Sequence, residues 1–160
     1  GGGRKKKDFA EKHDLIYRYS KTDKYIFNEI RIPYKSGSGA DRALKSGKKM
    51  NKKINGKVNK WKPNQEGKIP EDWWCIPFIN AMSNERLGYA TQKPKELLER
   101  IIKASSNEGD LVADFYGGSF TTAEVCKDLN RNFIGCDISQ KAVNIGLERT
   151  KERDKLTLFK

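Results

Sequence analysis

Cysteine and histidine are scarce in this chain of 160 residues, which has three cysteines and one histidine. Cys75, Cys126 and Cys136 are far apart, no CxxC pair occurs, and His13 has no partner motif. Zinc sites and disulfide frameworks need more of these residues at closer spacing, so neither is predicted. We expect the three cysteines to be small core or near-core residues of a protein in a reducing cytoplasm.

Long apolar runs are also lacking. No stretch of eighteen apolar residues occurs, and no signal-peptide pattern opens the chain, so a membrane partner is not predicted. Hydrophobic residues make up 36% and charged residues 34%, which is little apolar material for a full core. The chain begins with Gly1 and has no starting Met, which is compatible with an excised piece of something longer.

Positive charge is abundant but unevenly placed. Residues 1–70 hold 20 Lys and Arg against 7 Asp and Glu, a net charge of +13, whereas residues 71–160 hold 13 against 14. A polyanion is the expected partner of the basic front. A solvated basic surface without a partner is the alternative, and it explains less well why one half carries the whole excess.

Residue patterns divide the chain into three parts. In residues 1–34, two Tyr-, Ile- and Phe-rich stretches predict strands over 14–20 and 25–34. Residues 35–70 are rich in Gly, Ser, Asn and Lys and predict an irregular basic insertion. Within residues 71–160, the pattern predicts, in order, a helix over 93–104, a strand over 111–116, a helix over 121–129, a strand over 132–137, a helix over 139–150 and a final short strand within 155–159. This alternation predicts an α/β fold with a partial doubly wound parallel sheet.

A glycine turn follows the first strand of this alternation. Asp114, Phe115, Tyr116, Gly117, Gly118 and Ser119 end the predicted strand and open the next helix. A second acid, Asp137, ends the next strand, where it is well placed to bind ribose hydroxyls. The pattern is neither a Walker A loop nor GxGxxG. It predicts a nucleoside-containing cofactor, and the alternative is a simple tight turn.

Several stretches together resemble bacterial DNA amino-methyltransferases of the β group, in which the catalytic motif precedes target recognition and then the cofactor motifs. Thr91, Gln92, Lys93 and Pro94 resemble the TQKP element of that family. Residues 114–122 (DFYGGSFTT) resemble its DPFxGSGTT loop, and residues 133–139 (FIGCDIS) resemble its FIGIDIS strand. Shorter similarities lie at 13–21 and at 73–89.

The resemblance implies a Rossmann-like, class I methyltransferase sheet and S-adenosylmethionine as cofactor. It implies methyl transfer to the exocyclic amino group of adenine, less readily cytosine, in DNA, within a bacterial or phage restriction-modification system and in the cytoplasm. The cofactor residues that it implies are Thr91, Gln92, Lys93, Pro94, Asp114, Phe115, Tyr116, Gly117, Gly118, Ser119, Thr121 and Asp137.

Two departures from the family pattern matter. The last glycine of the loop is Phe120 here, whose ring either narrows the cofactor pocket or packs back onto the sheet. The catalytic tetrapeptide with its Pro-Pro-aromatic core is missing, since none of the five prolines are adjacent. We therefore expect no catalytic residue in this chain, and expect a second chain or a missing N-terminal segment to carry that motif. A non-catalytic DNA-binding remnant is the alternative, and a methyltransferase of RNA or small molecules fits the resemblance least.

The basic insertion lies where that family recognises its target. The predicted DNA-binding residues are Arg42, Lys45, Lys48, Lys49, Lys52, Lys53, Lys57 and Lys60. Lysines supply phosphate contacts, whereas base readout needs Arg, Asn or Gln. The candidates for readout are Arg42, Asn51, Asn55, Asn59, Asn64 and Gln65, and the sequence does not choose among them. In the free protein we expect a solvated loop.

Overall fold

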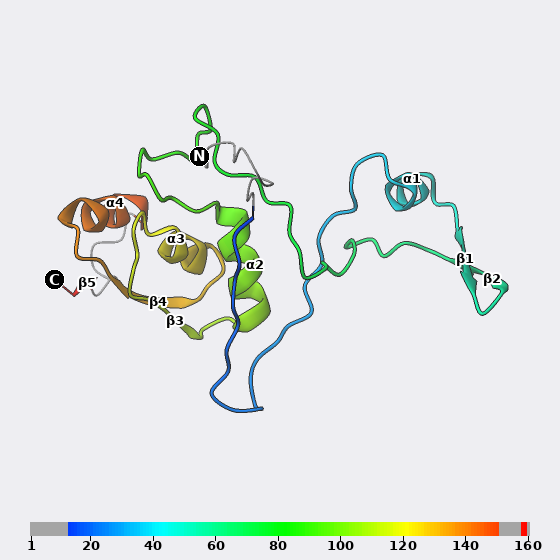
Figure 1. Cartoon of the computed structure of the whole chain (residues 1–160), viewed down its shortest axis with the longest axis horizontal. Coiled ribbons are helices and arrows are strands. Elements are labelled where there is room, and N and C mark those ends of the chain that lie inside the picture. The colour runs from blue at the N-terminus through cyan, green and yellow to red at the C-terminus, as the bar shows by residue number, and fades with distance from the viewer. Residues whose placement is uncertain (1–12, 151–157, 160) are drawn as a thin grey trace, which may run out of the picture.

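The structure is a computed structural model that describes residues 13–150 and 158–159. Its elements are α1 (Gly39–Ser46), β1 (Met50–Ile54), β2 (Lys57–Trp61), α2 (Lys95–Ser105), β3 (Leu111–Asp114), α3 (Thr121–Asp128), β4 (Asn132–Cys136), α4 (Gln140–Thr150) and β5 (Leu158–Phe159). Figure 1 shows α2 to α4 gathered on the sheet of β3 to β5, while α1, β1 and β2 form an arm that extends away from it. Across the described ranges, none of the helices has the length and apolar character to cross a membrane.

The sheet is parallel, with strand order β3-β4-β5. Each strand is followed by a helix before the next strand begins, so the alternation predicted for residues 93–159 is confirmed. Val112 of β3 lies opposite Phe133 of β4, and both side chains point toward the helices. The α/β prediction therefore holds for the rear of the chain.

All three helices cover the same face of this sheet. Ile102 of α2 packs with Val125 and Cys126 of α3, against Val112 and Phe133. A second cluster joins Phe120, Ala123 of α3 and Ala142 of α4, again against Phe133. The neighbours of Val112 along β3 face the other way, and Leu111 is 66% exposed. The second face of the sheet is therefore uncovered by the described residues, and β3 is an edge strand.

The strands predicted over 14–20 and 25–34 do not form, and that prediction is wrong. In this stretch the structure gives a single antiparallel bridge, between Ile32 and Lys68. The chain instead runs beside α2 (Figure 1). The Asn28 side chain donates to the carbonyls of Lys103 (3.0 Å) and Ser106 (2.9 Å), and its backbone N–H donates to Ala104 (2.8 Å). Strand residues need a neighbouring strand edge, and here the end of α2 takes part of the hydrogen bonding.

The insertion over 35–70 is not irregular, which corrects a second prediction. Ser38 caps α1 by accepting a hydrogen bond from the Asp41 backbone N–H at 3.2 Å. β1 and β2 then pair as an antiparallel hairpin around Asn55 and Gly56, both at positive φ. A helix cap and a two-residue turn form through hydrogen bonds between residues close in sequence, so these elements do not require a large hydrophobic core. For that reason a segment poor in apolar residues still folds into regular elements.

The cysteine prediction holds for two of the three residues. Cys126 is buried and Cys136 is half-buried, but Cys75 is exposed, so a core role for Cys75 is wrong. Cys75 lies in a stretch without helix or strand, where its side chain is exposed. Burial raises the pKa of the Cys126 thiol to about 11, so this thiol stays protonated and unreactive near neutral pH.

Candidate functional site

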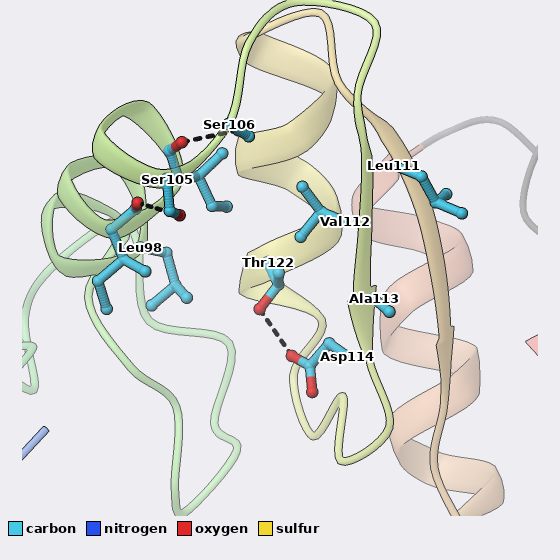
Figure 2. Close-up of a pocket in the computed structure, with 10 residues that line it drawn as sticks. Leu98, Ser105, Ser106, Leu111, Val112, Ala113, Asp114 and Thr122 are labelled. Atoms are coloured by element: carbon cyan, nitrogen blue, oxygen red, sulfur yellow. Dashed lines mark hydrogen bonds between the residues drawn. The ribbon is translucent and has the colours of Figure 1, made fainter. Parts of the chain in front are cut away.

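The glycine turn lies at the carboxyl end of β3, as predicted. Asp114 ends that strand, and its carboxylate accepts the Tyr116 backbone N–H at 3.0 Å and the Thr122 hydroxyl at 2.7 Å. Figure 2 shows Thr122 at the start of α3 pointing toward Asp114. Asp114 therefore fixes both the turn and the first residues of α3, and part of its hydrogen-bonding capacity serves structure.

The second acid is joined to the same turn. Asp137, which follows β4, accepts the Gly118 backbone N–H at 2.8 Å and the Ser139 backbone N–H at 2.8 Å, one on each carboxylate oxygen. The Gly117 N–H donates to the Cys136 carbonyl at 3.0 Å. The turn and the acid, 19 residues apart, thus form one rigid rim at the carboxyl edge of the sheet.

The segment Thr91–Gln92–Lys93–Pro94 lies against this rim. The Thr121 hydroxyl donates to the Lys93 carbonyl at 3.2 Å, and Tyr89 lies so close to Gly118 that a Cβ there would sit 3.3 Å from its ring. The structure therefore brings together residues 91–94, the glycine turn and Asp137.

Glu85 and Gln92 hold this segment in shape. The Gln92 amide accepts the Leu87 N–H at 2.9 Å and donates to the Glu85 carbonyl at 2.6 Å. The Glu85 carboxylate accepts the Lys95 N–H, the first residue of α2, at 2.7 Å. A carboxylate at a helix N-terminus satisfies a free donor and stabilises the helix dipole. Sequence analysis assigned no role to Glu85.

Phe120 packs inward, which decides between the two positions considered for its ring. It is fully buried and contacts Phe133 edge-on, with ring centroids 6.3 Å apart. A Cβ added at Gly117 or Gly146 would lie 2.7 Å or 2.6 Å from this ring. The ring thus occupies the space left by two glycines, on the buried side of the turn. Its backbone keeps the left-handed conformation (φ 52°) that a glycine would favour.

The outer side of the rim exposes apolar side chains. Tyr116 is 92% exposed, Phe115 is 63% exposed and Ile138 is entirely exposed. By contrast, Ser119 and Thr121 are buried, and their hydroxyls lie 3.1 Å apart. Ile138 was missed by sequence reasoning, although an apolar residue directly after the strand-ending acid was a usable signal.

An ion-pair network braces the turn from behind. Arg149 of α4 contacts Glu124 of α3 and donates to the Ser119 carbonyl at 3.2 Å. Lys95 of α2 binds the same Glu124 (3.0 Å) and Asp128 (2.7 Å). Burial lowers the pKa of Lys95, but the bonds to these two carboxylates outweigh burial and raise it overall. The three helices are therefore tied together beneath the turn.

A groove runs along the free edge of β3. Its volume is about 370 Å³, and Figure 2 shows its walls, which come from α2, β3 and the start of α3. The lining is mostly apolar and ends at Asp114 and Thr122. In the described parts of the chain, no cluster of His, Cys, Asp and Glu could hold a metal ion.

The predicted DNA-binding cations all lie on the arm. Arg42 and Lys45 are on α1, Lys48 and Lys49 follow it, and the other four are on the hairpin. All eight are exposed. Of these eight described residues, Lys45 is the one paired with a carboxylate, that of Asp41 at 3.0 Å. The arm therefore presents its positive charge to solvent.

Comparison with known proteins gives a family. The DNA methylase family (N6_N4_Mtase) matches residues 1–148. The chain belongs to this family. It is 40% identical over 153 residues to the type II methyltransferase M1.MboII of Moraxella bovis, covering 90% of this chain and 56% of that protein. The DNA adenine methyltransferase YhdJ of Escherichia coli is 36% identical, with coverage of 92% and 48%.

Further relatives give the same result. The type II methyltransferase M.HpaI of Haemophilus parainfluenzae is 34% identical over 91% of this chain and 40% of its own length. The chain thus spans about half the length of these relatives. The crystal structure of the M1.HpyAVI-SAM complex covers 36% of the chain at a TM-score of 0.36, too low to establish a common overall fold.

Proposed function

We propose that this DNA methylase family member takes part in transferring a methyl group from S-adenosylmethionine to the exocyclic amino group of adenine in DNA. The observation that carries the proposal is the rim, where Asp137 is bonded to Gly118 beside residues 91–94. Adenine is favoured over cytosine because one relative is by name a DNA adenine methyltransferase. The rim and the arm are the two parts of the chain that serve this function.

The rim residues fit a nucleoside-containing cofactor. Each Asp137 oxygen accepts one backbone N–H and retains capacity for a ribose hydroxyl. Gly117 and Gly118 let a ligand approach the backbone, and the exposed Phe115, Tyr116 and Ile138 offer apolar surface to a purine. Ser119, Thr121 and Gln92 hold the rim in shape through their bonds to its neighbours. When bound, S-adenosylmethionine supplies the methyl group.

The arm holds the DNA. Its eight exposed cations are spread along α1, the segment that follows it and both strands of the hairpin, a distribution that suits an extended polyanion better than a small anion. Contacts of this kind give affinity and register without reading sequence.

We further propose that another polypeptide segment, in this protein or in a second chain, supplies the catalytic loop. The free edge of β3, its groove and the exposed Leu111 form an apolar surface on which further strands and helices could pack. The sequence has no Pro-Pro-aromatic element, the motif expected to hold the target amine in line with the methyl group. Lost orientation costs on the order of 7–11 kcal/mol of barrier lowering.

Two measurements on the purified chain test the proposal. Calorimetric titration with S-adenosylmethionine or its demethylated product is expected to show binding. Incubation with DNA and radiolabelled cofactor is expected to leave the DNA unlabelled. Label in DNA at an ordinary enzymatic rate would contradict the second expectation, and Asp114 would then be the first residue to mutate.

A non-catalytic DNA-binding remnant is the second candidate. The missing tetrapeptide favours it. Calorimetry tests the form of this candidate that no longer binds the cofactor, because such a remnant binds DNA but gives no heat with S-adenosylmethionine.

A further inference from the structure

The β1–β2 hairpin has two chemically different faces. Residues directly opposite each other in an antiparallel pair share a face, and successive residues alternate. The register therefore assigns one face to Met50, Lys52, Ile54, Lys57, Asn59 and Trp61. The other face, called the open face below, consists of Asn51, Lys53, Val58 and Lys60.

The first face is turned toward α1 at its base. A Cβ added at Gly39 would lie 3.2 Å from the terminal methyl group of Met50, and Met50 and Trp61 are the half-buried residues of the hairpin. Every residue of the open face is exposed, whereas on the first face the covering by α1 is confined to the base, at Met50 and Trp61, and the residues beyond the base are exposed as well. Figure 1 shows the hairpin at the far end of the arm, away from the sheet. The open face is therefore free to meet a large ligand.

The open face carries the chemistry of base recognition. Asn51 lies directly opposite Lys60, which places the two Cβ atoms about 4.5–5.5 Å apart. The amide of an Asn side chain can donate a hydrogen bond to N7 of adenine and accept one from the N6 amino group. The ammonium group of a Lys side chain can donate hydrogen bonds to O6 and N7 of guanine. Residues 48–62 contain no acid that would repel DNA. A two-stranded ribbon also has the width that the major groove admits.

We propose that the open face enters the major groove and that Asn51 and Lys60 are specificity-determining residues, Asn51 for an adenine and Lys60 for a neighbouring guanine. This inference rests on the proposed function, because it needs the arm to lie on DNA. Lys52 and Lys57 of the opposite face then remain for phosphate contacts. The structure thereby separates Asn51 from Asn59, which the sequence left equivalent.

Selection from a pool of random-sequence duplexes by the full chain tests the assignment. Salt is raised until sequence-blind binding weakens, and the bound duplexes are sequenced. The wild type is expected to enrich sites containing an adenine next to a guanine. Asn51→Ala should lower enrichment at the adenine by roughly 5- to 150-fold, and Lys60→Ala should do so at the guanine.

The two faces of the hairpin provide matched controls. Asn59→Ala changes the same residue type on the opposite face and should leave the enriched sites unchanged. Lys57→Ala removes a proposed phosphate contact and should weaken binding to all duplexes alike without changing which sites are enriched. Circular dichroism verifies that all variants fold. Equal effects of Asn51→Ala and Asn59→Ala would overturn the assignment. Salt-dependent binding without any enrichment would also overturn it, while leaving the proposed DNA contact intact. Failure to bind any duplex at low salt would overturn the DNA contact itself.

Discussion

Phe120 is the residue at which this chain departs most clearly from the glycine loop of its family. Its ring fills the space between Gly117 and Gly146 and packs on Phe133. We expect Phe120→Ala to lower the free energy of unfolding by about 3–5 kcal/mol, because truncation leaves a cavity in the second core cluster. Urea unfolding measures this loss. Phe115→Ala, which removes an exposed ring, should change stability by less than about 0.5 kcal/mol, and an equal loss would contradict the inward packing.

Asp137 has two roles in the proposed site: its carboxylate accepts the Gly118 backbone N–H, and we propose that it also binds the ribose hydroxyls of the cofactor. Asp137→Ala removes both its bond to Gly118 and the acceptor for ribose hydroxyls. We expect affinity for S-adenosylmethionine to fall by roughly tenfold or more, since hydrogen bonds to a charged group contribute about 1.5–3 kcal/mol. Calorimetry measures this change. Asp72→Ala, at an exposed acid outside the rim, is the control, and unchanged affinity in Asp137→Ala would remove the ribose role.

At the level of elements, the start of α2 depends on an acid that lies ten residues earlier in the chain. The Glu85 carboxylate accepts the Lys95 N–H, and Pro94 provides no side-chain cap. We expect Glu85→Ala to lower stability by about 1 kcal/mol, as loss of a helix cap does. Thermal unfolding measures this loss as a lower melting temperature of the Glu85→Ala variant. The control is Glu108→Ala, which removes an exposed acid that makes no such bond. Equal melting temperatures for the two variants would show that the bond contributes nothing.

At the level of the whole molecule, the positive charge is concentrated in the front of the chain, because residues 1–70 carry a net charge of +13 and residues 71–160 a net charge of −1. We expect tight, largely sequence-blind DNA binding at low salt, with the logarithm of affinity falling linearly against the logarithm of salt concentration. Replacing Lys48 and Lys49 together by Ala should reduce this slope by up to about 2, because each lost phosphate contact removes about 0.9. Fluorescence anisotropy at several salt concentrations measures the slope.

The control for the salt slope lies on α4, a helix that packs on the sheet far from the arm in sequence. Lys141→Ala removes an exposed lysine of α4 and should leave the slope unchanged. A salt response that is flat in the wild type would eliminate the electrostatic basis of DNA binding, and an equal change in the Lys141 variant would show that the arm has no special role.

The sequence by itself determined the order of helices and strands in residues 93–159, because their apolar periodicity and glycine turns act locally. It also indicated the family, since residues 91–94, 114–122 and 133–139 keep their motifs at the family's spacing. It failed for residues 14–34, where the β-favouring composition is real but no strand among the residues that the structure describes lies alongside to pair with it.

Tertiary structure alone decided where the loop's Phe120 ring goes, because that depends on the space opened by Gly146, 26 positions later in the chain. It likewise joined Asp137 to Gly118 and Glu85 to Lys95, contacts between residues that no local pattern relates. On the arm, the hairpin register placed Asn51 and Asn59 on opposite faces. Sequence periodicity states which residues alternate, but only the pairing of strands and their packing against α1 determine which face remains open to a partner.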